Sequence, residues 1–216
     1  IESRKSLDVS ANQMTKVHNG EKYKGINVET LTMTDNPITV YPVEFAKSKS
    51  KIGFVNMRGC RLSDVPEEAF EGENVKYLMS LDFSYNDLND LPSSFNAVNM
   101  PYFYGLELSY NEFSKFPFEP LDCYGLTVFA IRGQRDKNGD RCLSEWPTGI
   151  YQHVGLRGFY IGSNNLGMIN DTISPLCYYL EISDNPDIVF DASGVCYEYS
   201  IGAYYLIYDK TQDVRG

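Results

Sequence analysis

The sequence predicts an α/β solenoid whose coils each contribute one short strand to a single parallel sheet. A pair of apolar residues two positions apart, followed three residues later by Asn or a substitute, occurs eight times. The steps between successive Asn-type positions are 24, 24, 26, 25, 23, 30 and 21 residues, so most coils are nearly equal in length. Pro stands six residues after four of these positions, at Pro42, Pro66, Pro92 and Pro117.

Each strand is expected to bury its apolar pair, because side chains alternate between the two faces of a strand. The pairs begin at Leu7, Leu31, Val55, Leu81, Leu106, Phe129, Phe159 and Leu180. The Asn-type positions that follow are Asn12, Asn36, Cys60, Asn86, Asn111, Gln134, Asn164 and Asn185. An Asn amide at the bend after a strand can satisfy backbone groups that the turn leaves unpaired, so these side chains are expected to form a ladder.

The Pro segments are expected to close the outer, convex side of each coil, because Pro suits a first helical turn but not a central strand. An apolar residue follows Pro by three positions at Phe45, Ala69 and Phe95. Short helical turns or irregular backbone are therefore predicted on the convex side, and the curved parallel sheet on the concave side.

One coil is longer than the others. The step from Gln134 to Asn164 is 30 residues, and Trp146-Pro147 fits the Pro pattern only if seven residues after Gln134 are removed. We expect residues 135–141 to form an inserted loop that projects from the solenoid just beyond the strand.

The unbroken repeats leave no room for a linker, so residues 1–216 are predicted to form a single solenoid domain. No Ser/Gly-rich or Pro-rich low-complexity segment interrupts them. The chain opens on Ile1 and begins almost directly in a repeat, which favours a fragment of a longer protein.

The repeat resembles the leucine-rich-repeat family over nearly the whole chain. Coils such as Leu-Pro-Ser-Ser-Phe at 91–95 are similar to those of bacterial and plant-like extracellular members. The Tyr-rich, acidic run at 204–213 and the Trp-Pro-Thr-Gly coil at 146–149 resemble secreted or lipid-anchored surface proteins of gut-type anaerobic bacteria. This resemblance implies a binding module rather than a catalyst, and an extracellular or cell-surface location.

The composition disfavours nucleic acid and membranes as partners. A formal net charge of −10 and a pI near 4.7 oppose binding to phosphate backbones and anionic lipid surfaces. No apolar run approaches the roughly 20 residues that a membrane-spanning helix needs. We therefore expect no nucleic-acid partner and no membrane insertion by this fragment.

The five cysteines are Cys60, Cys123, Cys142, Cys177 and Cys196, and an odd number excludes complete internal pairing. Cys60 stands in an Asn slot, where this repeat also accepts Cys. A bridge between Cys177 and Cys196 would join neighbouring coils, but free, buried thiols are the preferred prediction, because a solenoid of this length has a sufficient core. No Cys-x-x-Cys pair supports a zinc site.

The residues that flank the apolar pair of each strand are expected to face the concave surface. In the middle coils they place Asp82 beside Glu107 and Tyr85 beside Tyr110, at the spacing of adjacent strands, about 4.8 Å. Adjacent carboxylates repel unless a cation, a basic side chain or sugar hydroxyls satisfy them. The tyrosines could act as stacking platforms for a protein, basic peptide or glycan ligand. The candidate ligand-binding residues are Asp82, Tyr85, Glu107, Tyr110, Arg132, Tyr160 and Glu181.

A second interpretation of this face stays open. It could be a solvated acidic surface whose Ser and Thr residues are present for their strand propensity. The chain has 17 tyrosines, but several fall between strands, where packing is their ordinary role. These are Tyr77, Tyr102, Tyr124 and Tyr178.

Residues 136–140, Asp-Lys-Asn-Gly-Asp, resemble the first half of a calcium-binding EF-hand loop. However, Arg141 stands where that motif needs Gly, and Pro147 stands where it needs a bidentate Glu. A polar insertion that turns on Asn-Gly is the preferred interpretation. No metal ion and no other cofactor is therefore expected.

Catalysis is not expected either. Asp82 and Glu107 would lie on an open surface rather than in a cleft that raises one pKa. His18 and His153 occupy unlike places in distant coils, and a Gly-x-Ser-x-Gly motif is absent. The preferred function is a non-enzymatic module that binds its ligand on the concave face, at a bacterial cell surface. A structural spacer that presents neighbouring domains is the alternative.

Overall fold

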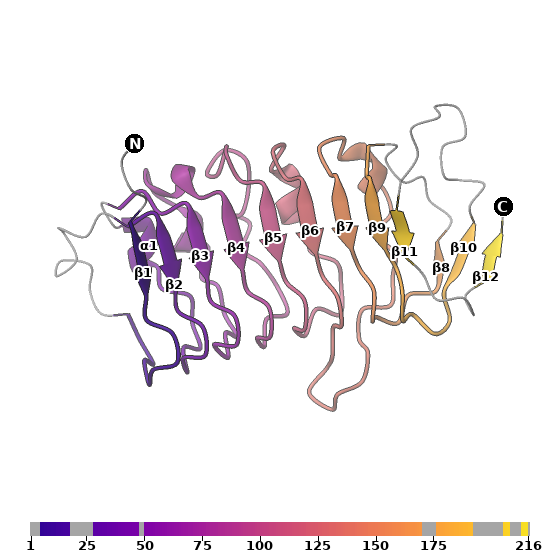
Figure 1. Ribbon diagram of the computed structural model, residues 1–216, viewed down its shortest axis with the longest axis horizontal. Helices are drawn as coiled ribbons and strands as arrows, with labels where there is room; N and C mark the ends of the chain where they lie inside the picture. The colour runs from indigo at the N-terminus through magenta and orange to yellow at the C-terminus, as the bar shows by residue number, and fades with distance from the viewer. Residues whose placement is uncertain are drawn as a thin grey trace.

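One curved parallel sheet runs along the molecule (Figure 1). The computed structural model describes residues 5–17, 28–47, 50–169, 176–191, 205–207 and 213–215. The strands of the sheet follow the order β1 (Ser6–Asp8), β2 (Thr30–Thr32), β3 (Phe54–Asn56), β4 (Ser80–Asp82), β5 (Gly105–Glu107), β6 (Val128–Ala130), β7 (Gly158–Tyr160), β9 (Tyr179–Glu181) and β11 (Tyr205–Ile207).

The eight predicted strands pair in register with their neighbours. Leu31 stands opposite Val55, and Leu81 stands opposite Leu106, so the first residue of each apolar pair occupies one column of the sheet. From Leu31 to Leu180 the residues of this column are at most 6% exposed. The predicted leucine-rich-repeat solenoid, in which these eight strands share one curved parallel sheet, is thereby confirmed.

The sheet contains one strand more than the sequence pattern predicted. In β11, Leu206 stands opposite Leu180 in the register of the sheet. Five residues after Leu206 the sequence has Thr211, where the other coils have Asn or a substitute. Because this coil lacks the Asn, the repeat pattern in the sequence did not include it.

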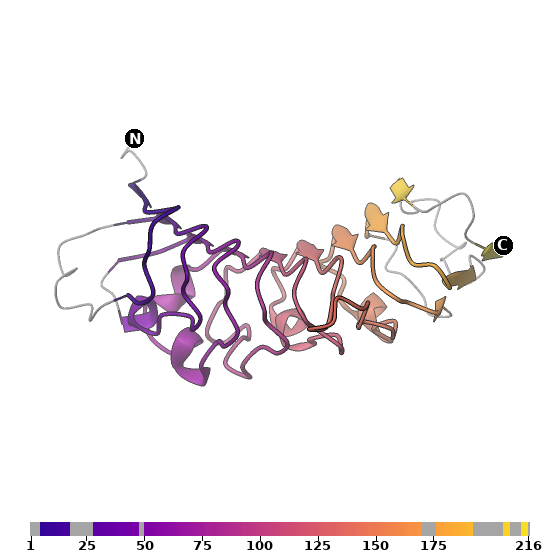
Figure 2. The same ribbon diagram turned by 90° about the horizontal axis from the view of Figure 1, so that it is seen from below.

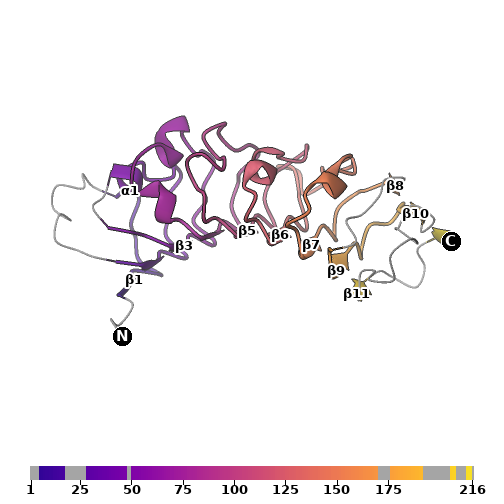
Figure 3. The ribbon, with the colours of Figure 1, turned by 90° about the horizontal axis from the view of Figure 1, so that it is seen from above.

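The sheet lies on the concave side of the solenoid, and the helical turns lie on the opposite, convex side (Figures 2 and 3). Neighbouring strands are spaced by about 4.8 Å, whereas helical segments pack about 8–10 Å apart. The stack therefore bends toward the sheet, as predicted.

The convex side contains little helix. Within the described residues, α1 (Glu44–Lys47) is followed by the 3₁₀ turns η2 (Glu67–Phe70), η3 (Val75–Tyr77), η4 (Glu119–Asp122) and η5 (Ile150–Gln152). The Pro segments introduce these turns, as expected: α1 follows Pro42, and η2 follows Pro66. In the coil of Pro92, the amide of Phe95 donates to the Pro92 carbonyl at 3.0 Å, and Phe95 is fully buried.

The last coils differ from the others on their outer side. There, β8 (Met168–Ile169), β10 (Val189–Asp191) and β12 (Asp213–Arg215) form a second parallel sheet in the order β12-β10-β8. Figure 2 shows these strands across the coil from β9 and β11. The sequence did not predict this sheet, because its strands are short and lack a repeated motif.

The buried side chains form one continuous cluster from Val28 to Ile188. Its aromatic rings pack edge to face: the centroid of Phe95 lies 4.9 Å from that of Phe70 and 5.1 Å from that of Phe103. Such pairs add to the free energy gained from burial alone. The core is therefore shared between coils rather than closed within each one.

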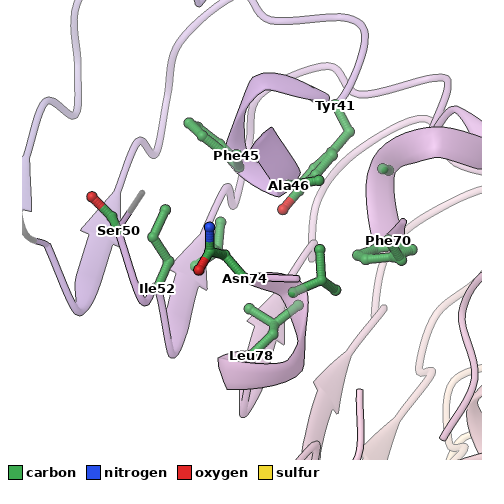
Figure 4. A pocket seen from close by; sticks show the side chains of 11 residues that line it. Tyr41, Phe45, Ala46, Ser50, Ile52, Phe70, Asn74 and Leu78 are labelled. Atoms are coloured by element: carbon green, nitrogen blue, oxygen red, sulfur yellow. The ribbon is translucent and has the colours of Figure 1, made fainter. Parts of the chain in front are cut away.

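A small void lies in the N-terminal part of the core (Figure 4). Its volume of about 20 Å³ is enough for a single water molecule. The side chains around it include Tyr41, Phe45, Phe70 and Leu78. Burial raises the pKa of Tyr41 above its usual range. The void is a packing gap and too small to hold a larger ligand.

Candidate functional site

The Asn side chains form the predicted ladder at the bend after each strand. Asn86 Oδ1 accepts hydrogen bonds from the amides of Cys60 (2.8 Å) and Leu62 (2.9 Å) in the preceding coil. Its Nδ2 donates to the carbonyls of Met57 and Phe83, both at 2.9 Å. Asn86 thus satisfies buried backbone groups of two coils and fixes the place where the strand ends.

Gln134 and Cys60 replace Asn in this ladder. Gln134 Oε1 accepts from the amide of Phe113 at 3.1 Å, and Nε2 donates to the carbonyl of Leu108 at 3.0 Å. The Cys60 thiol lies 3.0 Å from the carbonyl of Met33, so it replaces the donor of the amide. Both substitutes keep the coils joined at the bend.

The residue before each Asn-type position has a left-handed backbone. These positions, which we call the left-handed row, have φ between +53° and +68° and are Ala11, Asp35, Gly59, Tyr85, Tyr110, Gly133, Ser163 and Asp184. The left-handed conformation costs residues other than Gly about 1–2 kcal/mol, and it is uncommon for bulky side chains. Tyr85 and Tyr110 are therefore strained.

The rings of Tyr85 and Tyr110 stack across adjacent coils. Their centroids are 4.4 Å apart with an interplanar angle of 28°, and the residues are 45% and 39% exposed. From the coil before, the guanidinium carbon of Arg58 lies 4.0 Å from the Tyr85 centroid. Because Arg58 and Tyr110 come from the coils on either side of Tyr85, they cover its two ring faces. The edge of the Tyr85 ring remains exposed to solvent.

Glycines flank the tyrosine pair in the left-handed row, with Gly59 on one side and Gly133 on the other. A Cβ atom on Gly133 would lie only 2.6 Å from the ring of Tyr110. Gly133 therefore provides the space in which this ring lies. Burial and the neighbouring Tyr85 side chain raise the pKa of the Tyr110 hydroxyl.

Asp82 and Glu107 lie side by side, as their shared register predicted. Asp82 Oδ1 accepts hydrogen bonds from the amide and the hydroxyl of Ser84, at 2.9 and 2.6 Å. Glu107 Oε1 accepts from the amide of Ser109 at 2.9 Å. A serine two residues after each acid thus satisfies part of its carboxylate without a bound cation.

Arg132 connects carboxylates from two further coils. Its Nε donates to Glu181 Oε2 at 2.8 Å, and its Nη1 lies 3.9 Å from Glu107 Oε2. Its guanidinium carbon lies 4.4 Å from the ring centroid of Tyr160. Glu181 is only 7% exposed and also accepts from the hydroxyl of Ser183. The Glu181 carboxylate is therefore committed to Arg132 and Ser183.

The structure arranges the predicted site residues other than Asp82, which bonds Ser84, in two neighbouring groups on the concave side. One group is the tyrosine pair with Arg58, which the sequence analysis did not select. The other contains Glu107, Arg132, Tyr160 and Glu181. Arg58 could have been found from the sequence, because it precedes its Asn-type position by two residues, as Arg132 does. Ligand binding by these residues stays a prediction.

Two of the tyrosines between strands do not pack as expected. Tyr102 is 63% exposed and Tyr124 is 87% exposed, so the packing prediction is wrong for both. Tyr77 and Tyr178 are half-buried, and Lys51 Nζ lies 4.8 Å from the ring centroid of Tyr77. Exposure of an aromatic ring depends on the neighbouring coils, which a single repeat does not specify.

Four of the five cysteines are free thiols, and Cys196 lies outside the described residues. The alternative of a bridge between Cys177 and Cys196 therefore involves a residue that the structure does not describe. Cys60, Cys123 and Cys177 are buried as expected, whereas Cys142 is half-buried. Burial raises the pKa of Cys123 to about 12 and that of Cys177 to about 11. These two thiols are therefore protonated at neutral pH.

Residues 135–141 form a closed loop that projects from the solenoid between β6 and β7 (Figure 1). Asp136 Oδ1 accepts hydrogen bonds from the amides of Asp140 (2.9 Å) and Asn138 (2.8 Å), which lower the pKa of Asp136. The Asp136 carboxylate thus stabilises the turn itself. In the described part of the chain, no three His, Cys, Asp or Glu side chains come together as a metal site would require.

Arg141 joins this loop to the coils beyond it. Its Nη1 donates to the carbonyl of Asn164 at 2.9 Å, and its Nη2 lies 2.6 Å from Asp184 Oδ1. The hydrogen bond from Arg141 lowers the pKa of Asp184. The base of the loop is therefore part of the solenoid surface.

His153 is the histidine that the structure describes. His153 is 8% exposed, and its Nε2 lies 3.2 Å from the carbonyl of Cys123. His18 lies outside the described residues.

Among the residues that the structure describes, no helix is both long and apolar enough to cross a bilayer.

The fold is similar to that of two crystal structures of leucine-rich-repeat proteins. With the protein from Bacteroides thetaiotaomicron, the TM-score is 0.90 and the identity 36%, over 98% of this chain and 26% of that chain. With the protein from Bacteroides eggerthii, the TM-score is 0.88 and the identity 38%, over 98% and 37% of the two chains.

Sequence comparison gives a second, shorter match. Lumican from Bos taurus is 35% identical over 95 residues, which are 43% of this chain and 26% of lumican. No protein-family model matches the sequence. The chain thus spans less than half the length of each of these three relatives.

Proposed function

This chain is a leucine-rich-repeat protein, and we propose that it is a non-enzymatic binding module that recognises a ligand with the middle of its concave face. The contact surface, which we call the concave patch, consists of Arg58, Asp82, Tyr85, Glu107, Tyr110, Arg132 and Tyr160. A protein or a peptide is the ligand class that fits it best. The same proposal places the protein at the surface of a bacterial cell.

The strained tyrosine pair carries this proposal. In the same left-handed row, the flanking coils have Gly59 and Gly133, which adopt this conformation without strain. A Tyr there costs about 1–2 kcal/mol. Because Tyr85 is 45% exposed and Tyr110 is 39% exposed, the free energy gained by burying their rings offsets only part of this cost. Strained residues that persist in spite of such a cost concentrate at functional sites.

The geometry of the stack favours a protein or peptide over a glycan at this patch. A sugar ring would pack on an open aromatic face, but Arg58 and Tyr110 cover the faces of Tyr85. Ring edges and hydroxyls remain, and they suit hydrogen bonds to a peptide backbone or to polar side chains. Rings that are already fixed by their neighbours lose little conformational entropy when a ligand binds.

The charge of the concave patch is more balanced than the sequence suggested. Arg132 lies within 3.9 Å of the Glu107 carboxylate, and Arg58 adds a second positive charge beside the tyrosines. We therefore expect the aromatic anchors to dominate the affinity, with only a moderate dependence on salt.

Selection of random peptides displayed on phage against the isolated chain tests this function. The enriched peptides should bind the double variant Tyr85→Ala/Tyr110→Ala about tenfold more weakly or worse, because central aromatic anchors dominate interface energies. Tyr102→Ala is the matched control, because it removes an exposed tyrosine outside the patch. It should leave affinity unchanged, and circular dichroism should show that all variants fold.

Two results would contradict the proposal. Undiminished affinity of the double variant would move the site away from the concave patch. A selection that enriches no peptide would favour the structural spacer. The location is tested separately, by labelling intact cells with an antibody against the chain; labelling only after lysis would reject a surface location.

A further inference from the structure

A groove of about 400 Å³ opens on the convex side, between the coil that contains η4 and the coil that contains η5. Both turns lie on the side opposite the sheet (Figure 3), so the groove faces away from the concave patch. Its volume falls within the usual range for small-molecule sites, about 300–1,000 Å³. Three exposed apolar side chains line it: Phe118 (49%), Tyr124 (87%) and Val154 (67%).

The two aromatic walls of the groove differ in how they are held. The ring of Phe118 packs edge-on against Phe116, with centroids 5.1 Å apart, and Phe116 packs in turn on Phe129 in the core. Phe118 therefore presents a fixed ring with part of its surface open. Tyr124 gains little from packing, because 87% of it is exposed. Exposed apolar side chains that gather around one groove indicate an interaction site more strongly than scattered ones.

The floor of the groove brings the two coils into close contact. A Cβ atom on Gly155 would lie 2.8 Å from the carbonyl of Tyr124, so a side chain there would push the coils apart. His153 Nε2 lies 3.2 Å from the carbonyl of Cys123. Because a carbonyl only accepts, Nε2 carries the proton in neutral His153, and Nδ1 is an acceptor. This Nδ1 is buried and has no hydrogen-bond partner among the described residues, which is rare in native proteins.

We propose that this convex groove binds a neutral carbohydrate. The open surfaces of Phe118 and Tyr124 suit the apolar face of a sugar ring. Asp122 and Thr148 line the same groove, and a carboxylate and a hydroxyl suit the hydroxyl groups of a sugar. Among the described residues that line it, none is Lys or Arg, so the groove offers no positive charge to select an anion.

The floor provides a further reason for a hydroxyl-rich occupant. His153 Nδ1 needs a donor, and a hydroxyl that entered the floor of the groove after a small rotation of the imidazole would supply one. An apolar ligand would leave this acceptor unpaired. The site is independent of the concave patch, because the two surfaces share no residue.

Saturation-transfer-difference NMR of the whole chain with cellobiose, maltose and lactose tests the carbohydrate site. The wild-type chain should saturate at least one of these disaccharides. Tyr124→Ala should weaken that binding about tenfold, whereas Tyr124→Phe should retain it, because it keeps the ring face. Tyr102→Ala is the matched control, because it removes an exposed tyrosine outside the groove, and it should bind as the wild type does.

The variants also separate this site from the concave patch. Tyr85→Ala/Tyr110→Ala should leave saturation transfer intact. Loss of transfer in that double variant, with retention in Tyr124→Ala, would move the sugar to the concave patch and overturn the convex site. Absence of transfer to all three disaccharides would also overturn it, and neither result would affect peptide binding by the concave patch.

Discussion

Tyr85 and Asn86 are adjacent in the sequence, yet the two rows of side chains to which they belong have opposite properties. Asn86 is 5% exposed and bonds backbone groups of two coils. Tyr85 is 45% exposed, adopts a φ of +58° and packs against Arg58 and Tyr110. Asn or a substitute recurs in the ladder, whereas the left-handed row changes from Gly to Tyr to Ser to Asp.

This difference separates the part of each repeat that builds the solenoid from the part that is free to recognise a ligand. A ladder residue must satisfy buried donors and acceptors at fixed places, so few residue types fit there. A residue of the left-handed row has only to tolerate its backbone conformation, so its side chain can vary. The contrast leads to four predictions, which begin with the largest expected effect.

The ladder is the most sensitive region. Asn86→Ala should lower the free energy of unfolding by about 3 kcal/mol, because buried backbone groups of two coils lose their partner. Asn12→Ala is the matched control, since Asn12 is exposed and bonds carbonyls of its own coil, at Val9 and Ser10. It should cost less than about 1 kcal/mol. Urea unfolding measures the loss of free energy of unfolding in both variants. Equal losses would mean that hydrogen bonds shared between coils are not what makes the ladder stabilising.

The second-largest effect is expected at Gly133, which lies beside the tyrosine pair. Gly133→Ala should cost about 2 kcal/mol, because it combines left-handed strain with a clash against the Tyr110 ring. In a Tyr110→Gly background the clash disappears, and about 1 kcal/mol should remain. Gly139→Ala is a control with positive φ and open space around its Cβ. If the cost of Gly133→Ala did not depend on residue 110, the ring would not occupy the space above Gly133.

The strain itself can be measured at Tyr110. Tyr110→Ala and Tyr110→Gly both remove the stacked ring, but only Gly relaxes the left-handed backbone. We therefore expect Tyr110→Gly to be more stable than Tyr110→Ala by about 1 kcal/mol in thermal unfolding. An equal or reversed order would mean that the position is not strained and would remove the main support for the concave patch.

The smallest effect is expected where Arg141 meets Asp184. Arg141 lowers the folded-state pKa of Asp184 below its usual value of 3.8, so the contact stabilises the fold above that value and is lost as pH falls through the folded pKa. The Asp184 side chain is 54% exposed, so Asp184→Asn should cost less than about 1 kcal/mol at neutral pH. Thermal unfolding of both proteins as a function of pH should show this difference shrinking at acid pH; a constant difference would assign it to something other than the charge.

The repeat pattern alone predicted most of the fold. The apolar pair of Leu81 and Phe83 is almost fully buried, and the Asn that follows it enters the ladder, as local spacing required. The pattern missed β11, because its coil has Thr211 in place of Asn. It also missed β8, β10 and β12, because a strand of two or three residues without a repeated motif leaves no periodic signal.

The sequence predicted only those features of the candidate site that follow from strand register. Equal coil lengths place Tyr85 beside Tyr110 and Asp82 beside Glu107, and the structure has both pairs. Register does not say that Arg58 covers a face of Tyr85, nor that Glu181 is buried beneath Arg132. Both contacts depend on the rotamers by which long side chains lie over the neighbouring coil. The repeat spacing does not fix these rotamers.

The sequence by itself determined which residues enter the core, because strand alternation and coil length are local properties that repeat along the chain. It also determined which positions share a column of the concave face. Only the tertiary structure decided which of these side chains stay open to a ligand, since exposure is set by contacts between coils. The convex groove beside Tyr124 arises in the same way: its walls come from two coils, and neither coil alone contains it.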